Sequence, residues 1–323
     1  MTDVRNAAEL VCRWGGAVST VLFDPSVEIF GATGIDGVIA YRTGFGCAVA
    51  IGDPIAPLEQ MGCLASAFRQ HCKQLGLHTV YTVASDVFAT WAANAGYGVV
   101  EFGSELVVDP SHDPLVGHAA QALRRRVRRA EKEDVVAREY VGYDAALERA
   151  LEDAVEAWRR ARRGPQIYLM PLDLFAGREC KRWFYATRGD AITGVMELVR
   201  LESRHGFLLS QLTWTPDAPP GTTELLAVHA LRAIGEQGCT YATWGPAPLE
   251  RLGAVDGLSG FSEKLGRFVY RNTTRAFHLE ERNRYHRKFP IARRTGCHLL
   301  FDPPRLGLRE TLQVLRAYHA TAA

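Results

Sequence analysis

The same order of elements occurs twice along this 323-residue chain. In the first half, short apolar strands separated by turns are followed by a helix and then by an apolar strand at residues 79–83. In the second half, strands between 183 and 212 are followed by a helix from Thr222 and a strand from Tyr241. Grouped strands followed by helices are typical of α+β proteins. Because the chain is longer than one core usually spans, we expect two similar α+β units side by side.

Composition indicates an ordinary soluble globular protein, with 47% hydrophobic and 23% charged residues. The formal net charge is +2, so any affinity for nucleic acid must come from local clustering of basic residues. We find no apolar run of the roughly 18 to 20 residues that a membrane span requires, and no signal peptide. The seven cysteines are scattered, which predicts reduced thiols and a cytoplasmic location. The histidines and cysteines do not occur at the sequence spacings typical of metal ligands, so no metal is expected.

A basic segment at 117–134, GHAAQALRRRVRRAEKED, predicts a helix with one narrow apolar stripe that contains Leu123 and Val127. Like charges at i,i+4 spacing repel each other, so a polyanion is expected to offset the repulsion. One guanidinium group can donate two hydrogen bonds to the oxygens of one phosphate, so a cluster of arginines favours contacts with RNA. The alternative is a solvated helix face balanced by the acidic residues at its end. The candidate phosphate anchors are Arg124, Arg125, Arg128 and Arg129.

Residues 241–249, YATWGPAPL, predict a short buried strand that ends in a rigid loop. Gly245, Pro246 and Pro248 are expected to stop the strand, because proline cannot donate to a sheet. Loops at strand ends are where α/β proteins bind ligands. Trp244 could stack on an adenine base, although a tryptophan in a strand is more often a core residue.

Two carboxylates are candidates for catalysis. Glu197 lies between apolar residues of a predicted strand, where burial would raise its pKa and suit it to act as a base; the alternative is that its side of the strand is solvated. Glu224 lies in the first turn of a predicted helix, where the dipole favours it for catalysis or for capping. Lys264 and Lys288 either bind phosphate or are ordinary surface lysines. Residues 250–289 are predicted to be polar and mobile.

Several motifs occur in an order that resembles one known family. They are Gly52-Asp53-Pro54, Leu123-Arg124, the segments PDAPPGTTE at 216–224 and WGPAPL at 244–249, and YHRKFP at 285–290. The family is the soluble C-terminal domain, of DUF2156 type, of bacterial phosphatidylglycerol lysyl- and alanyltransferases, with its free-standing relatives that use aminoacyl-tRNA. The resemblance covers about residues 20–302.

This resemblance implies a fold of two tandem GNAT-like (acyl-CoA N-acyltransferase-like) domains joined by the basic helix. The implied boundaries are 1–115 for the first domain, 116–140 for the linker and 141–323 for the second domain. The implied activity is transfer of an aminoacyl group from aminoacyl-tRNA to a hydroxyl or amine, with no cofactor besides this co-substrate. Asp53, Trp244 and Pro248 are implied to line the substrate site.

The chain departs from the family at two points. The family usually carries an Asp-Leu-Met-Arg element before the proline loop, and its acidic and basic positions fall here on Ser210 and Thr213. Without that pair, a buried cationic side chain would be unmatched, so a small or neutral aminoacyl group is expected. The membrane domain of the family is also missing. The acceptor is therefore expected to be a small molecule, as in natural-product biosynthesis, or a lipid reached peripherally.

Two other functions stay open at this point. The first is an acyl-CoA-dependent N-acyltransferase with the same fold. Such enzymes usually bind pyrophosphate at a glycine-rich turn before a helix, and Pro219-Pro220-Gly221 stands there instead, with fewer backbone donors. The second is a non-catalytic RNA-binding protein, against which the rigid loops argue mildly. The sequence does not predict an oligomeric state.

Overall fold

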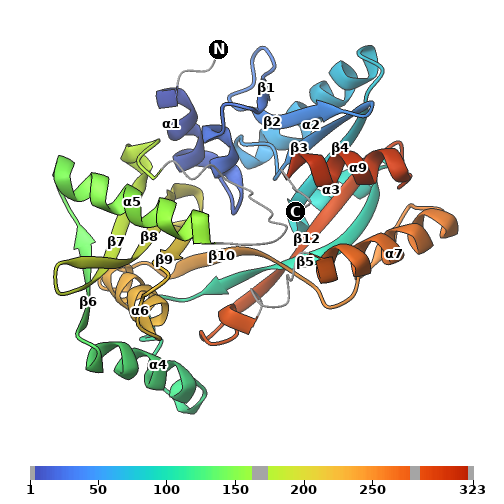
Figure 1. The fold of residues 1–323 in the computed structure, drawn as a ribbon. Coiled ribbons are helices and arrows are strands. Elements are labelled where there is room, and N and C mark those ends of the chain that lie inside the picture. The colour runs from blue at the N-terminus through green and yellow to red at the C-terminus, as the bar shows by residue number, and fades with distance from the viewer. Residues whose placement is uncertain (1–3, 162–173, 277–283, 319–323) are drawn as a thin grey trace.

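The computed structural model describes residues 4–161, 174–276 and 284–318, and within them one continuous mixed sheet forms the centre of the molecule (Figure 1). Its strands lie in the order β1 (Glu28–Phe30), β2 (Ile39–Gly44), β3 (Cys47–Ile51), β4 (His78–Ser85), β12 (Arg293–Asp302), β5 (Gly98–Val108), β10 (Tyr241–Pro248), β9 (Gly206–Trp214), β8 (Ala191–Leu201), β7 (Lys181–Arg188) and β6 (Val135–Tyr140), and the short β11 (Val255–Asp256) pairs with β5.

The two halves of the sheet are built alike. In the first half, β1, β2 and β3 are antiparallel, and helix α2 (Leu58–Gln74) crosses over to β4, which is parallel to β3. In the second half, β6 to β9 are antiparallel, and helix α6 (Thr222–Gly235) crosses over to β10, which is parallel to β9. Parallel neighbours require such a crossover, whereas antiparallel neighbours need only a turn. The predicted α+β class with two similar units is confirmed.

The halves share strands where they meet. β12, which comes last in the chain, lies between β4 and β5 and is antiparallel to both. β5 in turn pairs with β10 of the second half. The domain boundaries at 115 and 140 stay predictions, because strands from both sides of them lie in one sheet.

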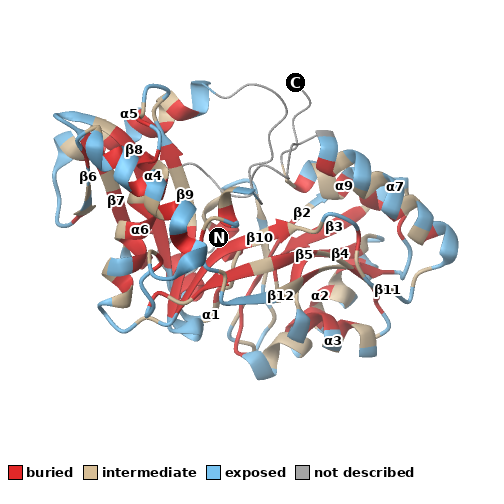
Figure 2. Cartoon of the chain, turned by 90° about the horizontal axis from the view of Figure 1, so that it is seen from below, coloured by how far each residue is buried: buried red, intermediate tan, exposed pale blue. Residues whose placement is uncertain are grey.

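Helices cover both faces of the sheet, and buried residues colour the strands and the inner sides of the helices in Figure 2. In the first half, α2 and α3 (Asp86–Asn94) enclose a core around Phe68 and Phe88, while α7 (Gly260–Ala276) and α9 (Leu308–Ala317) lie over the opposite core that contains Phe301. In the second half, α5 (Ala145–Ala161) covers one face and α6 the other. The basic helix α4 (Gln121–Lys132) packs on α6.

Helix α1 (Val4–Trp14) lies where the halves meet, and its Val11 shares a core with Val107 of β5 and Val199 of β8. Cys12 of α1 forms a disulfide with Cys180, just before β7. The expectation that all thiols are reduced is wrong for this pair, because the cysteines are 168 residues apart and sequence spacing does not show their proximity. The cytoplasmic location stays a prediction. No helix in the described residues is long and apolar enough to cross a membrane.

Part of the segment 250–289, which was predicted to be polar and mobile, forms a helix, while its residues 277–283 lie outside the described residues. Residues 260–276 form helix α7, and the Tyr270 hydroxyl lies 2.5 Å from the carbonyl oxygen of Phe102 and 2.8 Å from that of Leu249, so the two oxygens share its one proton. The prediction of a mobile segment is therefore wrong for α7. The helix was missed because its outward face mixes aromatic and basic residues, which obscures the usual apolar period.

Candidate active site

The sheet opens between β9 and β10. These strands pair over three residues each, 206–208 with 241–243. Beyond Thr243, β9 continues beside β8, whereas β10 follows β5 after a register shift between Thr243 and Pro246. The shift contains Gly245, which has a left-handed φ of 74° and donates its N–H to the Thr243 hydroxyl at 3.0 Å. Past this point no ladder joins the facing edges of the two strands.

The prediction that the strand ends in a loop at Gly245 is wrong, since β10 runs on to Pro248, opposite Gly103. After β9 diverges, no described strand lies on that edge of β10. Proline is tolerated on such an edge, because no neighbour there needs its missing N–H. Pro248 therefore lies on the strand that borders the opening.

Trp244 is buried in an aromatic cluster on the α6 side of the sheet. Its ring stacks on His286 (centroids 5.0 Å apart, planes 21° apart) and also contacts Tyr285 and Phe289 at 5.9 and 4.9 Å. One face of the indole is therefore covered by His286, and stacking on adenine stays a prediction. The indole N–H is buried and has no hydrogen-bond partner among the described residues. A buried donor of this kind is costly unless a ligand accepts from it.

Glu224 lies beside this cluster and is ion-paired. The amine of Lys288 donates to Glu224 Oε1 at 2.7 Å, and the hydroxyl of Thr223 donates to Oε2 at 2.9 Å. Burial alone would raise the pKa of Glu224, but Lys288 and Thr223 outweigh it and lower the pKa. The carboxylate is therefore ionised and stabilised, which makes it a weak base. The structure thus joins two residues that the sequence assigned to separate roles, catalysis and tRNA binding.

Glu197 is buried on the opposite face of the sheet. Successive residues of β8 alternate between faces, and its neighbours Met196 and Leu198 belong to the core under α6. Glu197 Oε2 lies 2.7 Å from the amine of Lys181, and both side chains are at most 3% exposed. The solvated alternative for Glu197 is wrong. The two predicted catalytic carboxylates lie on opposite faces of the sheet and are not brought together.

Lys181 was not among the residues predicted for the site. It begins β7, next to Arg182, and a lysine at the start of a strand gives no local sign of burial. Its position follows from pairing, because Lys181 lies opposite Val199, two residues from Glu197 on β8. The amine also donates to the carbonyl oxygen of Leu174 at 3.2 Å.

Ser210 and Thr213 lie on β9, on the stretch that continues past the opening. The register with β8 shifts so that Ser210 is the extra residue of a β-bulge between Leu209 and Gln211. Bulges re-aim side chains and are frequent beside active sites. The Thr213 side chain is buried, and its hydroxyl donates to the carbonyl oxygen of Val195 at 3.3 Å. Of this pair, Ser210 is the better candidate for a contact with substrate.

Asp53 occupies the corresponding position in the first half, just past the parallel pair of β3 and β4. Its Oδ1 accepts the N–H of Ser85 at 2.8 Å, which ties the two strands together beyond their ladder. Burial raises the pKa of Asp53, and the hydrogen bonds from Ser85 offset part of that rise. Asp53 therefore links β3 and β4 just past the end of their ladder, at the position where β9 and β10 separate in the second half.

Helix α4 presents a row of arginines. Its apolar stripe, with Leu123 and Val127, is buried, and the fit to α6 is close because a Cβ on Gly221 would lie 2.1 Å from the carbonyl oxygen of Arg126. Arg124 donates to the carbonyl oxygens of Leu115 and Gly117 at 2.6 and 2.7 Å, so it holds the preceding turn.

The other α4 arginines are exposed. Within the described part of the chain, no ion pair or hydrogen bond involves the side chains of Arg125, Arg126, Arg128 and Arg129. The solvated alternative invokes Glu131, Glu133 and Asp134 as counter-charges, and of these Glu133 pairs instead with Arg188 at 3.1 Å. Arg126 was not among the predicted anchors. Lys264 lies on α7, in the other half of the molecule from α4 (Figure 1), so the structure does not bring it to this row.

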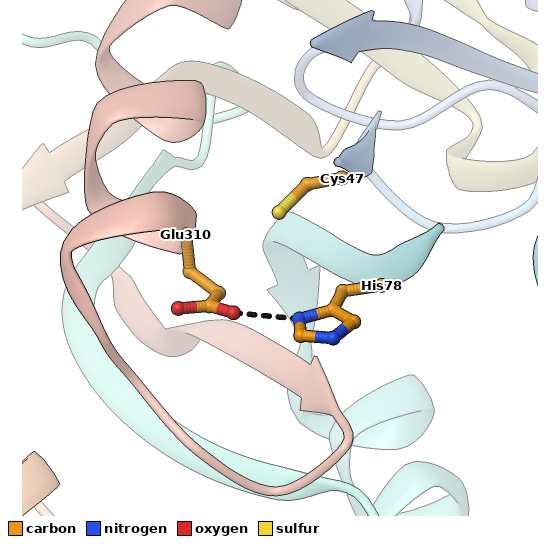
Figure 3. Close-up of side chains that lie close together, drawn as sticks. All are labelled: Cys47, His78 and Glu310. Carbon is orange, nitrogen blue, oxygen red and sulfur yellow. Dashed lines mark hydrogen bonds and ion pairs between the residues drawn. The ribbon is translucent and has the colours of Figure 1, made fainter. Parts of the chain in front are cut away.

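Three residues of the first half have the chemistry of metal ligands. Cys47, His78 and Glu310 have ligand atoms within 4.8 Å of one another (Figure 3). Glu310 Oε1 lies 2.7 Å from His78 Nδ1, while its Oε2 accepts the N–H of Gly307 at 2.8 Å at the start of α9. Burial raises the pKa of the Cys47 thiol to about 11, which disfavours the thiolate that a metal needs. The group is explained by the attachment of α9 to the sheet, and the absence of a metal stays a prediction.

Comparison with known proteins places this architecture in a family. The family model of the phosphatidylglycerol lysyltransferase C-terminal domain matches residues 17–290. The chain belongs to this family. The predicted resemblance is confirmed, and the predicted class, an aminoacyltransferase, is the one for which the family is named.

Individual relatives agree with this assignment. The chain is 28% identical over 218 residues to the lysylphosphatidylglycerol biosynthesis bifunctional protein LysX of Mycobacterium marinum, covering 66% of this chain and 19% of that protein. It is 26% identical over 206 residues to LysX of Rhodococcus opacus, covering 62% and 18%. The chain thus spans about a fifth of the length of these curated relatives.

Two solved structures share the fold. The C-terminal domain (DUF2156) of a putative lysylphosphatidylglycerol synthetase from Agrobacterium fabrum superposes with a TM-score of 0.79 at 17% identity, covering 97% of this chain and 95% of that one. L-PGS from Bacillus licheniformis gives a TM-score of 0.79 at 15% identity, covering 99% and 98%. The tandem fold predicted from the sequence is confirmed.

Proposed function

We propose that the chain is an aminoacyl-tRNA-dependent aminoacyltransferase. It moves a small or neutral aminoacyl group from tRNA to a hydroxyl or amine acceptor at the opening between β9 and β10. The observation that carries the tRNA part is the exposed row Arg125, Arg126, Arg128 and Arg129, whose side chains form no ion pair or hydrogen bond with any described residue. The row lies on a helix packed against α6, which begins beside the opening. The bound anion would be the phosphate backbone of the tRNA.

The chemistry needs little beyond positioning. The ester of aminoacyl-tRNA is already activated, so the acceptor oxygen or nitrogen bonds to the carbonyl carbon, and the ribose oxygen leaves with the proton that the acceptor gives up. The protein must align the acceptor, exclude water and stabilise the oxyanion. We assign the buried indole N–H of Trp244 and the ammonium of Lys288 to stabilisation of negative charge, with Glu224 positioning Lys288.

The preference for a neutral aminoacyl group is supported by the charge balance of the buried side chains. Glu197 is matched by Lys181, and Glu224 by Lys288. A lysyl side chain placed beside them would enter with no carboxylate left to match it, which is strongly unfavourable in a buried site. Hydroxyl groups, such as that of Ser210, suit a small or polar side chain.

The acceptor is proposed to be a hydroxyl-bearing molecule. The relatives are named for transfer to phosphatidylglycerol. A lipid of this kind and a soluble molecule with the same hydroxyl chemistry are the two candidates for this chain, and the experiment below separates them.

The test is single-turnover deacylation of purified alanyl-, glycyl-, seryl- and lysyl-tRNA. Each is incubated with the protein and either phosphatidylglycerol vesicles or a vesicle-free cell extract, with acetyl-CoA in parallel. We expect a neutral aminoacyl-tRNA to be consumed fastest and its label to appear on one acceptor. Fastest turnover of lysyl-tRNA would contradict the charge argument. Turnover of acetyl-CoA alone would replace the tRNA proposal with the acyl-CoA-dependent alternative.

A further inference from the structure

Helix α7 carries an exposed stripe that alternates aromatic and basic residues. The stripe consists of Phe261, Lys264, Phe268, Arg271 and Arg275, at spacings that place all five on one side of a helix. Phe261 is 76% exposed and Phe268 is 57% exposed, and the outer side of α7 is coloured as exposed in Figure 2. At 1.5 Å per residue the stripe is about 21 Å long. Two exposed phenyl rings on one helix face indicate an interaction surface.

The basic side chains of the stripe have no acidic partner in the part of the chain that the structure describes. The side chains of Lys264, Arg271 and Arg275 form no ion pair or hydrogen bond with any residue that the structure describes. The one acidic residue of α7, Glu263, pairs instead with Arg267 at 2.9 Å on the flank of the helix. Arg271 lies over the ring of Phe268, with its guanidinium carbon 5.9 Å from the ring centroid. The surface is thus both apolar and cationic.

We propose that this stripe binds the surface of an anionic lipid bilayer. Helices that lie in a membrane interface combine rings that enter the acyl boundary with lysines and arginines that meet lipid phosphates. A protein partner would have to desolvate three like charges around the rings, and the cores of protein interfaces are depleted of charged residues. The convex face of one helix also lacks the groove in which nucleic-acid bases usually stack on aromatic residues.

The inner side of α7 connects this surface to the site. The Tyr270 hydroxyl and the Arg267 guanidinium donate to the carbonyl oxygens of Leu249 and Leu252, both at 2.8 Å, in the segment that follows β10. Docking of the stripe therefore brings the strand that borders the opening close to lipid headgroups. The arginines of α4 lie in the other half of the molecule, so lipid and tRNA would occupy separate surfaces (Figure 1).

Lipid binding by the stripe deepens the proposed function and rests on it for its biological meaning. Vesicle binding is measured without tRNA, so lipid binding and aminoacyl transfer can each fail while the other stands. The full chain is floated with vesicles of phosphatidylglycerol and phosphatidylcholine, or of phosphatidylcholine alone. The variants are Phe261→Ala with Phe268→Ala, and Lys264→Gln with Arg271→Gln. The matched control is Arg125→Gln with Arg128→Gln, which removes two charges from α4. Circular dichroism confirms that each variant is folded.

Wild type is expected to bind the anionic vesicles and not the neutral ones. Either α7 variant should weaken that binding by about tenfold or more, since ring burial and basic residues both contribute to interfacial binding. The α4 control should bind vesicles as wild type does and lose tRNA affinity instead. Wild-type vesicle binding by both α7 variants would overturn the proposal. Loss of tRNA binding by the α7 variants with unchanged vesicle binding would also overturn it, and would make the stripe an RNA surface.

Discussion

The amine of Lys288 donates a 2.7 Å hydrogen bond to a carboxylate, that of Glu224, whose side chain is 5% exposed. Replacing Lys288 with Met should leave Glu224 buried and unmatched. We expect a loss of about 2 kcal/mol in the free energy of unfolding, below the range for fully buried pairs because Lys288 is partly exposed. Urea denaturation measures it. The double variant Lys288→Met with Glu224→Gln should recover part of the loss, and no recovery would mean that the two residues act independently.

The same pair predicts a pH dependence of stability. The pKa of Glu224 is lowered in the folded state, so the carboxylate contributes stability above its ordinary pKa of 4.5 and loses it as the pH falls through the folded value. In Glu224→Gln this component should be absent, and the fall in stability below pH 4.5 should be shallower than in wild type. Urea midpoints between pH 3 and 7 provide the measurement. Parallel curves for the two proteins would contradict the lowered pKa.

The arginines of α4 are expected to divide into two groups. Arg125→Ala, Arg128→Ala and Arg129→Ala should each reduce the slope of log affinity for tRNA against log salt by about 0.7 to 0.9. Arg124→Ala should lower thermal stability instead, because its guanidinium holds the turn at Leu115 and Gly117. Filter binding at several salt concentrations tests the slopes. An unchanged slope in the three variants would identify the row as a solvated surface.

The Cys12–Cys180 disulfide predicts the thiol content of the unreduced protein. Five of the seven cysteines should react with a thiol reagent after denaturation. The double variant Cys12→Ser with Cys180→Ser should lose roughly 2 to 4 kcal/mol of stability, because the bond closes a long loop in the unfolded chain. Titration of seven thiols in protein purified without reductant would show that the bond does not form under those conditions.

Local patterns predicted the parts of the fold that depend on neighbours in sequence. The short apolar run at 47–51 and the helix predicted from Thr222 identified β3 and α6, and the repeated order identified two similar halves. The insertion of β12 between β4 and β5 could not be predicted, because its partners lie some two hundred residues earlier and leave no mark on its own pattern.

Several residues of the site could be predicted from the sequence, but Lys181 and the arrangement of the side chains could not. The sequence identified Glu197 and Glu224 as candidates and left burial of Glu197 open. Their pairing with Lys181 and Lys288 depends on strand register and on the fold of the chain end. The prolines of β10 suggested a loop because sequence does not show that β9 leaves that edge uncovered. The bulge at Ser210 depends in the same way on its partner strand.

The position of β12 affects how the molecule can be made. A ribosome releases the first half well before residues 293–302, and until these arrive the inward edges of β4 and β5 lack the strand that separates them. Uncovered edges of this kind invite pairing with other chains. The sheet of the first half therefore cannot be completed until the end of synthesis. A chain truncated before β12 would lack the strand between β4 and β5.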